Sequence, residues 1–323
     1  MVQVSVVIPV YNGAATLAAA IDSALAQDFA DGFEVIVVND GSTDATAEVI
    51  DRYRGRIKTV NRENGGLSAA RNSGAAQATG DYLAFLDADD LWRRDKLAAT
   101  IGALEQNPGA VLVYCDAIQI DESGAQISPI FVSPSLARAP TMADLLERWW
   151  PILPSAAMVR RRIFEQLGGF FAPMRSYEDM DFWLRARELG EFEYVARALV
   201  VYRVTPAAER LVKYEQSYTL FVTRVSARYG IAARPLLRAI RHAHSTALGT
   251  RGLLAMRRGE MAAARRSFIR ALRYEPAGLR NMLRLARSFL PAPIARALSG
   301  RTGRIGTASD REQFERTGKQ VND

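Results

Sequence analysis

Short apolar runs alternate with amphipathic stretches over the first 90 residues of the chain. The runs at residues 4–10, 33–38, 57–60 and 82–86 are rich in β-branched residues or fully apolar, and turn residues follow them, so we expect strands there. The stretches between them repeat apolar residues at helical spacing. Strands that alternate with helices through short links predict right-handed crossovers and a mainly parallel sheet.

The pattern changes twice farther along the chain. The same criteria predict helices at 95–106, 142–150, 162–167 and 178–189, and strands at 110–116, 155–159 and 192–202. From Arg203 to about residue 298, apolar positions recur only at helical spacing. We therefore expect an α/β domain at 1–205, a basic helical extension at 206–300 and a flexible tail at 301–323.

The composition excludes several classes of protein. The chain has 323 residues, 49% of them hydrophobic, which suits one large domain or two. No apolar run approaches the roughly 20 residues that span a bilayer. The first residues have no basic segment before their apolar run, so we expect a strand there and no signal peptide. Cys115 is the only cysteine, which excludes an internal disulfide and fits a reducing cytoplasm.

Charge is divided unevenly along the chain. Residues 1–202 hold 18 Lys and Arg against 27 Asp and Glu, whereas residues 203–304 hold 21 against 4. We therefore expect the acidic and basic parts to be different structural units with different partners.

Polar clusters follow four of the predicted strands at the point where each strand ends. They lie at residues 9–11, 39–40, 61–71 and 87–89. Ligands of such sheets bind beyond the carboxyl ends of the strands, so we expect one site there. The crowded carboxylates Asp87, Asp89 and Asp90 repel one another, and a divalent cation such as Mg²⁺ or Mn²⁺ relieves this repulsion. The pattern predicts a metal and a phosphorylated ligand at this edge.

Five ordered segments resemble the motifs of the family 2 glycosyltransferases, which have the GT-A fold. They are Ser5-Val-Val-Ile-Pro-Val-Tyr-Asn12, Glu34-Val-Ile-Val-Val-Asn-Asp-Gly-Ser-Thr-Asp44, Asn64-Gly-Gly-Leu-Ser-Ala-Ala-Arg-Asn-Ser-Gly74, Asp81-Tyr-Leu-Ala-Phe-Leu-Asp-Ala-Asp-Asp90 and Glu178-Asp-Met-Asp-Phe-Trp-Leu-Arg185. The resemblance covers roughly residues 3–205. It implies a Rossmann-like α/β fold with a mixed, mainly parallel sheet. It also implies the inverting transfer of a sugar from a nucleotide-sugar to an acceptor hydroxyl.

The resemblance places the nucleotide on the loops after the first strands. It implies that Tyr11 stacks on the base, that Pro9 and Asn12 belong to the loop that shapes the pocket, and that Asp40 accepts a hydrogen bond from a pyrimidine N–H. Gly65 permits close approach of the backbone to the ligand. The alternatives are a turn role for Asp40 and simple packing for Tyr11.

In the same way, the resemblance places Asp87 near the ribose and Asp89 on the metal. Arg71 is expected to hold the nucleotide or to orient Asp87. The alternatives are a carboxylate-rich turn that caps a helix from about Leu91, and an arginine on a solvated helix face. No Gly-x-Gly-x-x-Gly or Walker A segment occurs, which argues against the usual dinucleotide and ATP loops.

One position departs from the family pattern. Many members carry a histidine shortly after the last strand, where it helps to hold the metal, but here that position is Thr205. His242 and His244 lie far along the chain, two residues apart on a predicted helix, and are expected to be ordinary helix residues. We therefore expect the metal to be held by Asp89, diphosphate and water.

The acceptor hydroxyl needs a general base, and a carboxylate within hydrogen-bond reach suffices. The family's acceptor motif points to Asp179, with Glu178 positioning it or contacting the acceptor. An acidic first turn stabilised by the helix dipole is the alternative. Trp149 and Trp150 are candidates for an acceptor-binding sugar platform.

The basic helical end has two competing interpretations. Residues 279–298 alternate arginines with large apolar residues, a pattern typical of a helix lying on an anionic membrane surface. A helix packed on the catalytic domain with a solvated arginine face is the alternative. We expect no nucleic-acid partner, because the rest of the chain is acidic and no known binding motif occurs. Residues 252–276 resemble one tetratricopeptide-like hairpin, too little for a solenoid.

The sequence thus predicts a metal-assisted inverting glycosyltransferase that uses a nucleotide-sugar, most simply a UDP-sugar, and a glycan or lipid-linked acceptor. We expect it in the cytoplasm or on the inner face of the membrane; nothing in the sequence indicates an oligomeric state. A sugar-nucleotidyltransferase is one rival, but residues 9–13 lack the Lys or Arg of a triphosphate loop. A non-catalytic scaffold that binds through its basic helices is the other.

Overall fold

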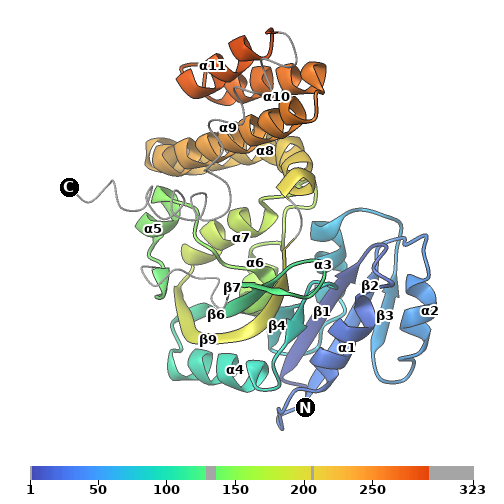
Figure 1. Cartoon of the computed structure of the whole chain (residues 1–323). Helices are drawn as coiled ribbons and strands as arrows, with labels where there is room; N and C mark the ends of the chain where they lie inside the picture. Colours follow the sequence, from blue (N-terminus) through green and yellow to red (C-terminus); the bar gives the residue numbers. More distant parts are fainter. Residues whose placement is uncertain (1, 129–135, 205–206, 291–323) are drawn as a thin grey trace. The chain divides into compact units, whose positions relative to one another are not determined.

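The computed structural model describes residues 2–128, 136–204 and 207–290 (Figure 1). The chain divides into two compact units, the first ending at Leu237 and the second beginning at Arg238. Helix α8 (Ala207–Tyr229), which we expected to open the helical extension, falls within the first unit.

The first unit is built on one mixed sheet in the order β3-β2-β1-β4-β8-β6-β9-β5, with β7 paired to β6. Its strands are β1 (Val4–Val10), β2 (Phe33–Asn39), β3 (Lys58–Asn61), β4 (Tyr82–Phe85), β5 (Leu91–Trp92), β6 (Ala110–Ile120), β7 (Gln126–Ser128), β8 (Ala157–Arg160) and β9 (Glu191–Arg203). The first four strands of this order are parallel, and β8 is antiparallel to both β4 and β6. The predicted α/β class with a mixed sheet is confirmed.

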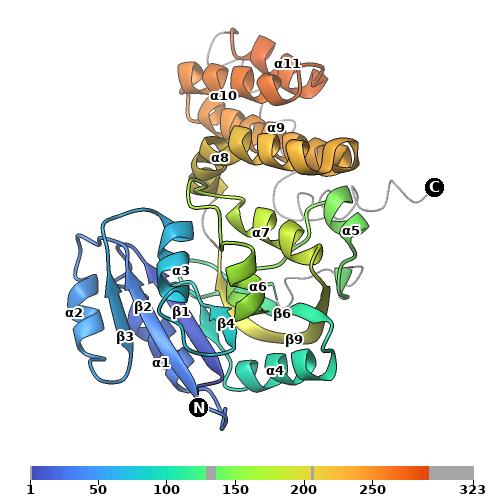
Figure 2. The same ribbon diagram turned by 180° about the vertical axis from the view of Figure 1, so that it is seen from behind.

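Helices cover both faces of this sheet, which Figures 1 and 2 show from opposite sides. They are α1 (Leu17–Leu25), α2 (Thr46–Asp51), α3 (Leu67–Ala75), α4 (Lys96–Gln106), α5 (Met142–Glu147), α6 (Arg161–Gln166) and α7 (Glu178–Arg187). Alternate residues of β1 serve the two faces: Val6 and Ile8 join the core with α1, whereas Val7 contacts Gly74 of α3. Every residue of β1 is therefore buried, as its apolar run predicts.

The chain after Asp90 differs from the capping alternative. Asp90 is followed by the short strand β5, and α4 begins only at Lys96. The carboxylates at 87–90 therefore do not cap a helix from Leu91, and that alternative is wrong. A 3₁₀ turn, η2 (Pro154–Ala156), lies on the other side of Asp90 and leads into β8.

The second unit is helical within its described residues. It holds the part of α9 (Arg234–Arg257) from Arg238 on, α10 (Met261–Tyr274) and α11 (Leu279–Arg287). Phe268 packs against Gly252, which joins α9 and α10 in a hairpin.

The two histidines of this unit lie in different surroundings. The Nδ1 atom of His242 lies 2.8 Å from a carboxylate oxygen of Glu275. His244 is buried, and this burial lowers its pKa to about 4. Neither histidine joins a metal-binding cluster among the described residues.

No described helix is long and apolar enough to cross a bilayer.

Candidate active site

The loops that follow β1 and β2 are tied together at the sheet edge. Asn12 adopts a left-handed backbone conformation with φ 52°, and its side-chain oxygen accepts from the Thr43 N–H at 2.8 Å. The Asn12 N–H in turn donates to Ser42 Oγ at 3.0 Å. Beside this junction Tyr11 is 53% exposed, and Pro9 is buried near the carboxyl end of β1. The exposed Tyr11 ring is available to stack on a base, and this role stays a prediction.

Asp40 anchors the glycine loop that precedes α3. Its carboxylate is 2% exposed and accepts from the N–H groups of Gly65, at 3.0 Å, and Gly66, at 2.7 Å. The Arg62 guanidinium lies 3.2 Å from the same carboxylate. The sequence did not predict this anchoring role, because Asp40 and Gly65 are 25 residues apart and no local pattern links them. The contact between Asp40 and a base stays a prediction.

The three carboxylates after β4 differ in environment. Asp87 and Asp89 are half-buried, whereas Asp90 is 1% exposed and accepts from Ser155 Oγ at 2.6 Å and from the Arg203 N–H at 2.9 Å. Burial, and then the charges of Asp87 and Asp89, raise the pKa of Asp90 well above its usual value. Ser155 also accepts from the Asp87 N–H at 3.0 Å, so Asp90 fixes the backbone that presents Asp87.

The fit of a divalent metal to this edge follows from its oxygen donors. Asp87 and Asp89 offer hard oxygen ligands of the kind that Mg²⁺ and Mn²⁺ prefer. Among residues 2–128, 136–204 and 207–290, no three Asp, Glu, His or Cys side chains gather to form a complete metal site. That diphosphate and water supply the remaining ligands of a metal on Asp89 stays a prediction. Thr205, which replaces the family's histidine, lies outside the described residues.

Arg71 joins the two halves of the site. Its guanidinium is 1% exposed, lies over the Phe170 ring, and donates to Asp87 at 2.6 Å and to Glu178 at 2.9 Å. The alternative of a solvated arginine is therefore wrong. The contact with Asp87 agrees with an orienting role for Arg71. The contact with Glu178 spans 107 residues of sequence and was not foreseen.

Glu178 and Asp179 open α7, and their environments separate their chemistry. Glu178 is paired with Arg71, whereas Asp179 accepts from the Met180 N–H at 2.7 Å. Burial, and then the neighbouring Glu178 charge, raise the pKa of Asp179 to about 7, against the opposing influence of Arg71. A carboxylate with such a pKa can both lose and accept a proton near neutral pH.

The two tryptophans of the predicted sugar platform lie in different environments. Trp149 is 36% exposed, and its ring centroid lies 5.8 Å from that of Tyr177, the residue before α7. Trp150 is 4% exposed and donates its indole N–H to the Tyr114 hydroxyl at 3.0 Å. The prediction for Trp150 therefore needs correction, because its ring is a core group and offers no face to a sugar.

Comparison with known proteins gives one consistent result. A model of glycosyl transferase family 2 matches residues 5–168. An uncharacterized glycosyltransferase of Rickettsia typhi is 31% identical over 235 residues, which cover 69% of this chain and 72% of that protein. The chondroitin synthase of Pasteurella multocida is 29% identical over 195 residues, covering 59% of this chain and 20% of the synthase.

Two solved structures share the fold. S. aureus TarS 1–349 in complex with UDP gives a TM-score of 0.59 at 21% identity, covering 94% of this chain and 92% of TarS. The mannosyltransferase PcManGT from Pyrobaculum calidifontis, in complex with GDP-Man and Mn²⁺, gives 0.58 at 20% identity, covering 92% and 84% of the two chains. At these identities the likeness concerns the fold alone.

Proposed function

Because the chain belongs to glycosyl transferase family 2 and is a glycosyltransferase, we propose that it transfers a sugar from a UDP-sugar, with inversion, to a hydroxyl of a glycan or lipid-linked acceptor. The solved relatives with UDP, UDP-GlcNAc and GDP-Man support a nucleotide-sugar donor. The relatives named chondroitin synthase and hyaluronan synthase support a glycan acceptor.

The proposal is carried by the unequal pair of carboxylates at the start of α7. Arg71 compensates the charge of Glu178, which leaves Asp179, with its pKa of about 7, as the group that takes the proton of the acceptor hydroxyl. The acceptor oxygen then forms a bond to the anomeric carbon, while the bond from that carbon to the diphosphate oxygen breaks. The electron pair of the broken bond leaves with the nucleoside diphosphate.

The donor side is assigned as follows. Tyr11 stacks on the base, Asp40 accepts a hydrogen bond from an N–H of the base, and Asp87 lies near the ribose. Asp89 would hold a Mg²⁺ or Mn²⁺ ion, which neutralises the charge that grows on the diphosphate. The Mn²⁺ of PcManGT supports a divalent metal in this family.

The test is release of nucleoside diphosphate from UDP-glucose, UDP-GlcNAc and GDP-mannose, with and without Mn²⁺. We expect turnover of at least one of these, with kcat rising as the pH rises through about 7, because Asp179 must lose its proton to act as a base. The Asp179→Asn variant should retain UDP binding and lose roughly 10²- to 10⁴-fold in kcat. Unaltered turnover by Asp179→Asn would refute the assigned base. The scaffold alternative would instead be favoured if Asp179→Asn lost turnover and cellular function persisted.

We propose in addition that the second unit attaches the enzyme to the inner face of an anionic membrane. Leu279 and Leu283 are 65% and 51% exposed on α11, which also carries Arg280 and Arg287, and Phe289, two residues after this helix, is 64% exposed. Apolar anchors flanked by arginines suit an anionic lipid surface. Residues 291–298 of the predicted amphipathic stretch lie outside the described residues.

Sedimentation with lipid vesicles tests this attachment. The protein should bind vesicles that contain phosphatidylglycerol and ignore pure phosphatidylcholine. Leu283→Glu should weaken that binding without changing turnover of a soluble donor. Equal binding to both kinds of vesicle would contradict the proposal.

A further inference from the structure

Helix α8 presents one face to the segment that carries the proposed base. Ser217, Phe221, Arg224 and Arg228 follow one another at intervals of four, three and four residues, which places them on one side of the helix. Each of them contacts the segment from Arg175 to Glu188 or its neighbour Phe171. This face lies beyond residues 5–168, which the family model matches.

The contacts of Ser217 and Phe221 hold a strained turn. Tyr177, directly before α7, has φ 65°, a left-handed conformation that costs a residue other than glycine about 1 kcal/mol or more. The hydroxyl of Ser217 accepts from the N–H groups of Arg175, at 2.8 Å, and Ser176, at 3.1 Å. The Phe221 ring stacks on Tyr177 with a centroid distance of 4.9 Å. The direction in which the chain enters α7 therefore depends on α8.

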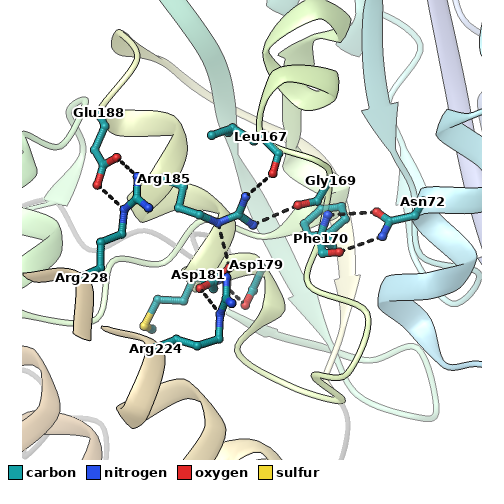
Figure 3. Close-up of polar contacts among 11 residues, drawn as sticks. Asn72, Leu167, Gly169, Phe170, Asp179, Asp181, Arg185, Glu188, Arg224 and Arg228 are labelled. Carbon is teal, nitrogen blue, oxygen red and sulfur yellow. Dashed lines mark hydrogen bonds and ion pairs between the residues drawn. The ribbon is translucent and has the colours of Figure 1, made fainter. Parts of the chain in front are cut away.

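The next contact fixes the first turn of α7 itself. The Asp181 N–H donates to the Tyr177 carbonyl at 2.9 Å, which closes this turn around Asp179. The Asp181 carboxylate is buried and accepts from Arg224 Nε at 3.1 Å and from Arg185 Nε at 2.9 Å (Figure 3). Removal of either arginine would leave a buried carboxylate with half of its compensation.

A chain of polar contacts continues from Arg185 toward the donor side. Arg185 also donates to the carbonyls of Leu167 and Gly169, at 2.8 and 2.9 Å. The next residue, Phe170, exchanges two backbone hydrogen bonds with the Asn72 side chain of α3 (Figure 3). The turn that carries Asp179 is thus held from α8 on one side and from α3 on the other.

We propose that Ser217 and Arg224 of α8 are positioning residues for Asp179, holding the turn that aims its carboxylate at the acceptor hydroxyl. This inference rests on the proposed function of Asp179 as the base. It assigns the two residues no contact with donor or acceptor. Catalytic geometry is sensitive to such support, since a misplacement of about 1 Å can cost roughly 10²-fold in rate.

The experiment compares variants of the full chain by release of UDP from a UDP-sugar and by calorimetric binding of UDP. Arg224→Met keeps an aliphatic side chain and removes the guanidinium that lies over Phe171 and pairs with Asp181. Arg224→Lys restores a cation, and Ser217→Ala removes the shared acceptor. Arg228→Met is the matched control, because Arg228 lies on the same face but pairs with Glu188 at the far end of α7. We expect Arg224→Met and Ser217→Ala to lose about 10- to 100-fold in kcat with donor KM and UDP affinity within about twofold of the parent.

We also expect Arg224→Lys to recover part of the kcat that Arg224→Met loses, and Arg228→Met to keep a kcat close to that of the parent. The inference is overturned if folded Arg224→Met and Ser217→Ala keep kcat within about twofold, or if Arg228→Met loses as much as Arg224→Met. Should Arg224→Met fail to fold, Ser217→Ala and Arg224→Lys decide by the same criteria.

Asp179→Asn, measured alongside, separates the two hypotheses. Full activity of Asp179→Asn refutes the proposed base and, with it, this inference. Loss of activity in Asp179→Asn beside fully active α8 variants refutes the positioning role alone.

Discussion

Replacing Lys96 by methionine should stabilise the protein, although the change removes a charge from an enzyme rich in carboxylates. The Lys96 side chain is fully buried at the start of α4. Its ammonium has no hydrogen-bond partner among the described residues and lies 4.0 Å from the centroid of the Trp92 ring. A buried cation with only a ring for compensation destabilises the folded state.

The magnitude follows from the pKa. Burial lowers the pKa of Lys96 from 10.5 to about 8, which corresponds to about 3 kcal/mol of lost folding free energy while the group is protonated. Methionine has a similar shape and forfeits the cation–π contact, worth about 1 kcal/mol. We therefore expect Lys96→Met to raise the free energy of unfolding by about 2 kcal/mol at neutral pH.

The pH dependence gives the sharper test. Below about pH 8 both folded and unfolded states carry the proton, so the full penalty applies. Between about 8 and 10.5 the unfolded state keeps the proton that the folded state has lost, so the stability of the parent rises. The gap between Lys96→Met and the parent should therefore shrink as the pH rises through this range.

Urea unfolding followed by circular dichroism, at about pH 7 and about pH 10, measures the gap directly. Lys96→Arg is the control, because a guanidinium stays charged and should bring no gain. The reasoning is refuted if Lys96→Met is no more stable than the parent at neutral pH, or if the gap is the same at both pH values.

Three further changes test the site. Arg71→Met should lower the free energy of unfolding by about 3–5 kcal/mol, because it leaves Asp87 and Glu178 without their cation. It should also move the acidic limb of the pH–rate profile to higher pH, because Arg71 lowers the pKa of Asp179; an unmoved limb would contradict this electrostatic link. Gly66→Ala, at φ +88° and with its new Cβ against the Arg175 guanidinium, should lose more stability in urea than Gly124→Ala, which has φ +86° and open space around it. Equal losses would mean that the exposed Arg175 side chain moves aside at no cost. Trp149→Ala should raise the acceptor KM with little change in melting temperature, whereas Trp150→Ala should lower the free energy of unfolding by about 3–5 kcal/mol. The reverse pattern would mean that Trp150, and not Trp149, contacts the acceptor sugar.

The sequence predicted the features that depend on local order along the chain. The apolar run before Asp87 and the glycine pair before Leu67 fix a strand end and a helix start, whatever lies far away. Because parallel strands align their carboxyl ends, the order of the segments sufficed to bring the ends of β1, β2, β3 and β4 to one edge. The donor-binding roles of the residues there stay predictions. The α/β class and the glycosyltransferase assignment followed from the same ordered segments.

The features that escaped prediction are contacts between distant segments. Nothing near Arg71 indicates Glu178, and nothing near Asp90 indicates Ser155 or Arg203. Antiparallel pairing of β8 with β4 brings Ser155 to Asp90, and antiparallel pairing of β9 with β5 brings Arg203 there; strand periodicity does not predict which strands pair. Burial of Trp150 beside exposed Trp149 also depends on a distant segment: both residues follow α5, which ends at Glu147, and Trp150 is held by Tyr114, 36 residues away.

Arg71 also sets a limit on how this enzyme can be recombined. A chimera that exchanged the segment after residue 168 for that of a relative, in order to change the acceptor, would replace Glu178 while leaving its guanidinium behind in the buried interior. Such a graft carries the cost of an uncompensated arginine unless the incoming segment also places a carboxylate at that point. The segments before and after residue 168 can therefore be exchanged without this cost only between chains that keep the charge pair, which makes Arg71 the first residue to match when a partner for such an exchange is chosen.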